Sequence, residues 1–303
     1  MSAPAQGGSQ VRWAWAKINL YLEIVGRRAD GYHLLESLIV FAGCGDRLSL
    51  RLDEPPGFRC AGRFAGQLPP GADNLVTRSL ARLEALTGPL PPFQIELDKQ
   101  LPVASGIGGG SADAAALIEG ALGLGGRKLP SDAYKRLALD LGADLPVCLY
   151  GRPALVGGIG ERVSRAPPLP AAWLVLVNPG VALATPAVFA AREGAFSAVR
   201  PWSVLPTTAP DLAVCLADRT NDLEAPARRL APEIDQVLNV LLDQEGCLLA
   251  RLSGSGATCF GLFAGPVEAK SAAGRIAQSQ PAWWSVACPI LHGKLARHWR
   301  QDP

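Results

Sequence analysis

The sequence predicts an α+β protein of two domains, and three observations support this prediction. The chain has 303 residues, about twice the length of a typical single domain. A glycine-rich run at 102–113 joins a segment that alternates like a strand to a segment with helical spacing. The second half is expected to contain strand, helix, strand, strand, helix and strand, which is the split βαβ pattern of a ferredoxin-like domain.

A proline-rich segment separates the two halves. Three prolines lie between Arg165 and Pro170, and such segments are typical of domain boundaries. We therefore expect an N-terminal domain over 11–165 that carries the glycine-rich run, and a C-terminal domain over 171–298.

The first half is expected to begin with a long strand over 11–25. Its alternation places Lys17 and Asn19 among aromatic side chains, opposite an ordinary apolar face. Two interpretations are open. The lysine could lie over the aromatic rings with its ammonium in water, or the lysine and the asparagine could point together into a cleft.

A turn-rich loop follows this strand, and its tip carries Tyr32 and His33. Recognition residues are frequent at such tips, so His33 is either structural or a residue that stacks on or hydrogen-bonds a ligand. Strands are expected next over 34–42 and 46–52, joined by a glycine-containing turn at 43–45.

The remaining elements follow from turn residues and periodicity. In the first half we expect a loop or an irregular hairpin over 53–72, a helix over 75–86, a strand over 93–99, a helix after the glycine-rich run and another over 131–141. In the second half we expect strands over 173–177, 247–252, 259–263 and 284–290, helices from 185, over 232–244 and over 266–278, and a loop over 195–222.

Asp144 follows the helix over 131–141, at the start of a segment that we expect to lead into a strand. It is the only carboxylate between Leu141 and Gly160. A turn-capping role and a functional role are both open for it.

The glycine-rich run is the strongest indication of function. Four glycines in five positions leave backbone N–H groups free to surround a phosphate, and the following helix, with Ser111 as its expected N-cap, favours an anion. A flexible turn without a ligand is the simpler alternative. The run does not match a Walker A loop, which ends in Gly-Lys-Ser/Thr. A dinucleotide fingerprint also fails, because the third glycine is misplaced and the later acidic residue is missing.

A phosphoryl-transfer site needs a phosphate cradle, a cation near the developing charge and a base that orients the attacking hydroxyl. The glycine-rich run, Lys17 and Asp144 can fill these three roles in turn. The sequence alone does not bring them together.

Composition excludes several other classes of function. The net charge is +2 with no basic stripe, so nucleic acid is not an expected partner. Residues 1–10 lack the features of a signal peptide, and no apolar run reaches the roughly 18 residues of a membrane span, so we expect a cytoplasmic protein. None of the seven cysteines forms a C-x-x-C pair, so buried free thiols are expected rather than disulfides or a zinc site.

Several blocks resemble the GHMP small-molecule kinases. Residues 102–115 resemble the phosphate loop of that superfamily, and 253–258 its C-terminal glycine motif. Further blocks resemble the branch that phosphorylates cytidine-diphospho-methylerythritol: Ala16-Lys17-Ile18-Asn19-Leu20, Gly26-Arg27-Arg28-Ala29-Asp30-Gly31-Tyr32-His33, Asp73-Asn74-Leu75 and Gly142-Ala143-Asp144-Leu145-Pro146-Val147. The matches keep the expected order over nearly the whole chain.

The resemblance implies a two-domain GHMP kinase fold, with an N-terminal ribosomal-S5-like ATP-binding domain and a C-terminal ferredoxin-like domain on the substrate side. It implies ATP-dependent phosphorylation of the 2-hydroxyl of the cytidine-diphospho substrate in non-mevalonate isoprenoid biosynthesis, with Mg²⁺. Asp144 matches the catalytic base, and Lys17 matches the residue that polarises the hydroxyl.

The resemblance also implies the binding residues. The positions that contact the substrate in this family correspond here to Asn19, Tyr32, His33, Thr185 and Phe189. The positions that contact ATP correspond to Asn74, Lys99, Pro102, Val103, Ala104, Ser105, Gly106, Ile107, Gly108, Gly109, Gly110, Ser111 and Ala112. The protein ligands of the metal are not assigned, because Ala112 stands where some members have a second serine.

Two other functions compete with this one. A GHMP kinase for a mevalonate-like or homoserine-like alcohol is disfavoured by Tyr32 and His33, which match a cytosine contact. A catalytically silent nucleotide-binding sensor is disfavoured by the presence of Lys17 and Asp144. The expected partner is a small molecule, and the sequence does not indicate an oligomeric state.

Overall fold

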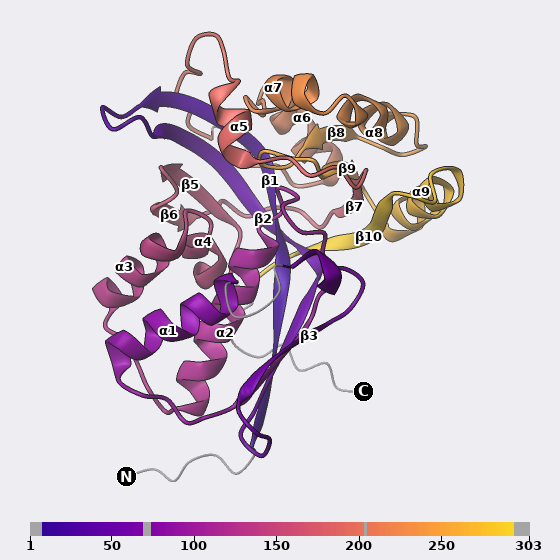
Figure 1. The fold of residues 1–303 in the computed structure, drawn as a ribbon. Helices are drawn as coiled ribbons and strands as arrows, with labels where there is room; N and C mark the ends of the chain where they lie inside the picture. The colour runs from indigo at the N-terminus through magenta and orange to yellow at the C-terminus, as the bar shows by residue number, and fades with distance from the viewer. Residues whose placement is uncertain (1–7, 69–73, 203–204, 294–303) are drawn as a thin grey trace.

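The computed structural model describes residues 8–68, 74–202 and 205–293 and confirms an α+β fold (Figure 1). Two long antiparallel strands, β1 (Ser9–Arg27) and β2 (His33–Arg51), run through the molecule. The helices numbered α1 to α4 lie to one side of these strands, and α6 to α9 lie with the C-terminal strands on the other side (Figure 1).

The smaller elements are distributed between the two halves. The first half adds β3 (Gly57–Ala61), a 3₁₀ turn (Ala65–Gln67), α1 (Leu75–Thr87), β4 (Gln94–Asp98), α2 (Gly109–Leu124), α3 (Ser131–Leu141), α4 (Leu145–Tyr150), β5 (Ala154–Gly158) and β6 (Arg162–Arg165). The second half contains β7 (Trp173–Asn178), α5 (Thr185–Ala190), α6 (Ala209–Ala217), α7 (Glu224–Leu230), α8 (Glu233–Leu242), β8 (Leu249–Leu252), β9 (Cys259–Phe263), α9 (Pro266–Ser279) and β10 (Trp284–Leu291).

The strands of the two halves meet in one continuous order, β3-β4-β2-β10-β7-β9-β8. In the second half, β7 lies between β10 and β9, and β8 and β9 form a hairpin, which is the predicted ferredoxin-like arrangement. Ile290 and Leu291 of β10 pair with Ala42 and Phe41 of β2. This ladder holds the halves together. The boundary that we expect at 165–171 stays a prediction, and residues 294–298 lie outside the described residues.

The predicted turn at 43–45 is wrong, because β2 continues through these residues. A Cβ atom on Gly43 would lie 2.8 Å from Pro289 Cδ, and one on Gly45 would lie 2.5 Å from the carbonyl oxygen of Ala14. Both glycines therefore let neighbouring strands approach closely.

Three helical segments also differ from the predictions. The segment after Asp144 leads into the strand β5 as expected, but it first forms the short helix α4, which the sequence did not predict because a brief apolar run fits either structure. The loop expected over 195–222 contains α6, which begins at a capping box formed by Thr208 and Asp211. Helix α7 was not predicted. The N-cap of α2 is Gly108 at φ +64° and not Ser111.

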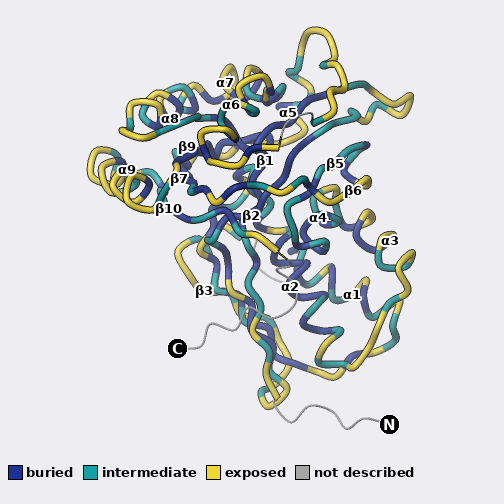
Figure 2. Tube along the Cα trace, turned by 180° about the vertical axis from the view of Figure 1, so that it is seen from behind, coloured by how far each residue is buried: buried dark blue, intermediate teal, exposed yellow. Residues whose placement is uncertain are grey.

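Strand β1 contributes to all three apolar clusters of the core. Its pairing with β2 shifts register after Trp15, Asn19 and Ile24, and each irregularity can turn the next side chains toward a different layer. Ala14, Ile18 and Ile24 accordingly lie in three separate clusters. Figure 2 shows the buried centre formed by β1 and β2, with most exposed residues on the outer helices and loops.

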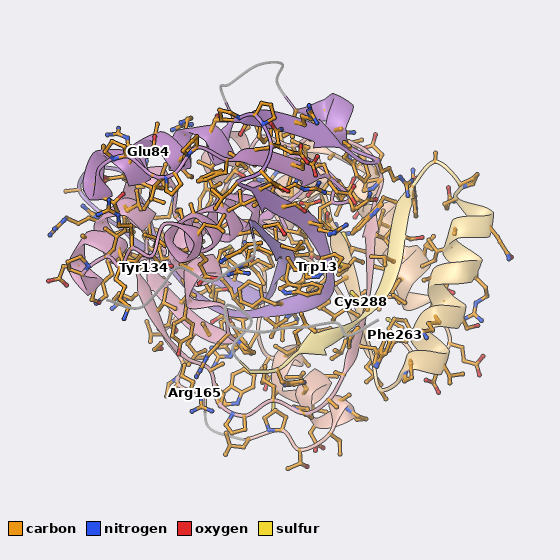
Figure 3. The ribbon with its side chains drawn as sticks, turned by 90° about the horizontal axis from the view of Figure 1, so that it is seen from below. Trp13, Glu84, Tyr134, Arg165, Phe263 and Cys288 are labelled. Carbon is orange, nitrogen blue, oxygen red and sulfur yellow. The ribbon has the colours of Figure 1, made fainter. Side chains whose placement is uncertain are left out.

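A view from below shows how the layers flank these strands (Figure 3). Glu84 of α1 and Tyr134 of α3 lie on one side of the molecule, Phe263 of β9 lies on the other, and Trp13 of β1 lies between them. Among the described residues, no helix is long and apolar enough to cross a membrane.

Candidate active site

A cavity of about 950 Å³ lies where β1, the glycine-rich run, α4 and α5 come together. Its lining contains most of the predicted site residues, namely Lys17, Asn19, Tyr32, His33, Lys99, Pro102, Val103, Ala104, Ser105, Gly106, Gly108, Gly109, Gly110, Ser111, Asp144, Thr185 and Phe189. Ile107 and Ala112 pack instead into the apolar core. Asn74 is the N-cap of α1, where its Oδ1 accepts a hydrogen bond of 3.1 Å from Thr77 N.

The predicted cation and the predicted base are in contact. Lys17 Nζ lies 3.1 Å from Asp144 Oδ2 and donates a hydrogen bond of 2.9 Å to Asn19 Oδ1. The lysine side chain is only 4% exposed, whereas that of Asp144 is 43% exposed. A buried ammonium is therefore fixed by two oxygens, and the carboxylate beside it is open to a ligand.

The glycine-rich run touches this pair directly. A Cβ atom on Gly108 would lie 3.0 Å from Lys17 Cε and 3.7 Å from Asp144 Oδ2. The backbone N–H of Lys17 donates to the carbonyl oxygen of Ile107 at 2.9 Å. The cradle, the cation and the carboxylate thus occupy one site, as phosphoryl transfer requires.

The turn at 253–258 from the second half holds the glycine-rich run in place. Thr258 N donates to the carbonyl oxygen of Ser105 at 3.1 Å, and Ser253 Oγ donates to that of Gly106 at 3.2 Å. Gly106 has a φ of +76°, and a Cβ there would lie 2.4 Å from the carbonyl oxygen of Ser253. Glycine is therefore required at this position both by conformation and by space.

Lys99 lies beneath the run rather than free in the cavity. Its ammonium contacts Asp46 Oδ2 at 2.5 Å and Asp113 Oδ2 at 2.7 Å, and all three side chains are almost fully buried. Burial raises the pKa of Asp113 to about 7, against the opposing effect of Lys99. Asp46 Oδ1 also accepts from the backbone N–H groups of Gln100 and Leu101. This cluster fixes the chain just before the run.

The other end of the cavity is aromatic. The rings of His33 and Phe189 stack with centroids 5.3 Å apart and an interplanar angle of 29°, while Tyr32 is 63% exposed. Burial, followed by the charges of Arg27 and Arg192, lowers the pKa of His33, which favours the neutral ring. Thr185 Oγ1 and Ser255 Oγ share a hydrogen bond of 2.7 Å.

Sequence reasoning missed several residues of this site. Arg192 and Ser255 line the cavity, and Ser37 lies behind it in contact with Asn19. Ser255 could have been found, because it belongs to the glycine-containing turn that resembles the C-terminal motif. Ser37 carries no local signal in a strand of ordinary apolar composition.

The structure also bears on metals and thiols. The described residues contain no group of three or more His, Cys, Asp or Glu that could hold a metal ion by itself. All seven cysteines are free thiols as predicted, but only Cys148, Cys259 and Cys288 are buried, and the other four are partly exposed.

Comparison with known proteins gives a consistent result. The models of the GHMP kinase N-terminal and C-terminal domains match residues 74–152 and 211–282. The chain is 49% identical over 276 residues to the 4-diphosphocytidyl-2-C-methyl-D-erythritol kinase of Paramagnetospirillum magneticum. The aligned region covers 91% of this chain and 96% of that protein.

Solved structures with the same fold include two kinases. The crystal structure of a 4-(cytidine 5′-diphospho)-2C-methyl-D-erythritol kinase superposes with a TM-score of 0.73 at 32% identity, covering 94% of this chain and all of that one. A homoserine kinase from Cytophaga hutchinsonii has a TM-score of 0.67 at 20% identity, over 96% of this chain and 97% of that one, and shows a likeness of fold alone.

Proposed function

Because the chain belongs to the 4-diphosphocytidyl-2-C-methyl-D-erythritol kinase family of GHMP kinases, we propose that its cavity transfers the terminal phosphate of ATP to the 2-hydroxyl of that diphosphocytidyl substrate. This reaction belongs to the non-mevalonate synthesis of isoprenoid precursors. The observation that carries the proposal is the 3.1 Å contact between Lys17 and Asp144 beside the glycine-rich run.

Asp144 is the proposed base. Its carboxylate is open to the cavity while Lys17 holds one of its oxygens, so the other oxygen can accept a hydrogen bond from the attacking hydroxyl. As the new phosphorus–oxygen bond forms, the bond from the terminal phosphorus to the bridging oxygen of ATP breaks, and ADP leaves with that electron pair. The hydroxyl proton passes to the carboxylate of Asp144. Two hydrogens of the Lys17 ammonium are used by Asn19 and Asp144. The third hydrogen can point to the reacting oxygens, where the positive charge stabilises the negative charge that develops.

The glycine-rich run is the proposed triphosphate site. Its backbone turns at Gly106 and Gly108, and α2 begins immediately afterwards, so free N–H groups and the positive end of a helix dipole converge there. Asn74 and Lys99 stay predicted contacts near the nucleotide base. The contact of Asn74 is supported by its side-chain amide, because Asn74 Nδ2 is buried and finds no acceptor among the described residues. This amide group can therefore donate a hydrogen bond to the nucleotide.

Mg²⁺ fits this site through few protein ligands. Magnesium in kinases is commonly held by one or two protein oxygens together with substrate phosphates, and Ser111 lines the cavity in the first turn of α2. We propose Ser111 as the residue that would hold it. When bound, the ion neutralises charge on the phosphates.

The stack of His33 and Phe189 is the proposed site of the cytosine ring, with Tyr32 at its open edge. His33→Ala is expected to raise the KM for the diphosphocytidyl substrate about tenfold, because one stacking partner is worth roughly 1–1.5 kcal/mol. Steady-state kinetics with each substrate varied in turn would measure this, and the KM for ATP is the internal control. An unchanged KM for the cytidine substrate would reject the stacking role.

A substrate panel tests the function as a whole. Purified protein with ATP and Mg²⁺ is offered the diphosphocytidyl substrate, mevalonate or homoserine, and ADP release is recorded with product identity. We expect turnover with the first alone. Turnover of either other alcohol without the first would identify a different GHMP kinase. ATP binding without turnover of any of them would favour a sensor.

A further inference from the structure

A buried serine contacts Asn19, the residue that accepts a hydrogen bond from Lys17. Ser37 is on β2, is 1% exposed, and does not line the cavity. Its Oγ donates a hydrogen bond of 2.5 Å to the carbonyl oxygen of Tyr21 and accepts one of 2.8 Å from Asn19 Nδ2. It therefore contacts Asn19 but cannot touch a substrate.

The single hydroxyl hydrogen of Ser37 determines which way the amide of Asn19 points. Since this hydrogen is used by the carbonyl oxygen of Tyr21, the serine oxygen can only accept a hydrogen bond. The NH₂ group of Asn19 must then face Ser37, and its Oδ1 must face Lys17 Nζ, 2.9 Å away. The opposite orientation would place an NH₂ group against an ammonium, which has no acceptor.

The orientation of Asn19 in turn directs Lys17. Asn19 Oδ1 and Asp144 Oδ2 take two of the three ammonium hydrogens, so the third has a defined direction. We propose that Ser37 is a positioning residue, which fixes the amide of Asn19 and thereby aims the ammonium of Lys17. This inference rests on the proposed function, since it concerns the same reaction.

A double-mutant cycle between Ser37→Ala and Asn19→Ala tests the inference. Ser37→Ala alone is expected to lower kcat about tenfold, the size of effect that a small misplacement of a reacting group produces, with the KM for ATP changed less than about twofold. In the Asn19→Ala background the same substitution should change kcat less than about twofold, because Ser37 then has no amide to orient. Equal effects of Ser37→Ala in both backgrounds would overturn the inference.

Two further variants separate hydrogen bonding from packing. Ser37→Cys nearly preserves volume but has a weak donor and acceptor, so its kcat should fall as in Ser37→Ala. Ser37→Thr keeps the hydroxyl and should restore kcat to within about threefold of the wild type. A cysteine variant with wild-type kcat would show that Ser37 only fills space and would reject the positioning role.

The wild-type protein in the same assay distinguishes the two proposals. If it does not phosphorylate the diphosphocytidyl substrate, the proposed function fails. If it does, and the cycle is additive, the inference about Ser37 fails by itself. Thermal unfolding of each variant shows whether a lost activity reflects lost fold.

Discussion

Asp144→Asn is expected to lower kcat by about 10³-fold, with the KM values of both substrates nearly unchanged. The amide has the shape of the carboxylate but cannot take the proton of the attacking hydroxyl, and general base catalysis contributes roughly 10²–10⁴-fold. The substitution also leaves the buried ammonium of Lys17 without its anionic partner, so thermal unfolding of the variant must show that the fold is kept. Initial rates of ADP release at saturating ATP would measure the effect.

Asp140→Asn is the matched control for this variant. Asp140 is an exposed carboxylate near the end of α3, so the same chemical change there should leave kcat within about twofold of the wild type. If Asp144→Asn also kept a near-normal kcat, Asp144 would not be the base, and the hydroxyl would have to lose its proton to another acceptor.

Lys17→Met is expected to lower kcat about 10²–10³-fold, the usual cost of removing a fixed charge that stabilises a transition state. Methionine approximates the length of the lysine stem, which is almost fully buried, so packing is largely kept. The substitution removes the contacts to Asn19 Oδ1 and Asp144 Oδ2 as well as the positive charge at the glycine-rich run. Single-turnover experiments with pre-bound ATP would show the loss in the chemical step itself.

Lys135→Met provides the control, because Lys135 is exposed on α3 and its charge is remote from the chemistry. Its kcat should match that of the wild type. A Lys17→Met enzyme that retains more than about a tenth of wild-type kcat would show that the backbone N–H groups and the metal ion supply the stabilisation without the lysine.

The general architecture could be predicted from the sequence because each half has a regular local signal. Alternation of side chains predicted β1, and the glycine-rich run with its helix predicted an anion site. The contact between Lys17 and Asp144 could not be predicted in this way, since the two lie far apart in the chain and only the fold brings them together. Resemblance to a family suggested their roles, and the structure shows their contact.

The errors have a common physical origin in tertiary context. Gly43 and Gly45 suggested a turn, but they allow close approach of Pro289 and Ala14, which no local pattern can report. The segment after Asp144 is short and apolar, so its helical state depends on packing rather than on propensity. Ser37 has no sequence signal because its role depends on two partners on the neighbouring strand, Asn19 and Tyr21.

The turn at 253–258 has a consequence for the order in which the protein is made. The carbonyl oxygens of Ser105 and Gly106 receive their hydrogen bonds from Thr258 and Ser253, which are translated long after the glycine-rich run itself. Domains generally fold from the N-terminus as synthesis proceeds. A nascent chain that has folded its first half therefore still lacks the hydrogen-bond donors that fix the glycine-rich run until residues 253–258 have been made.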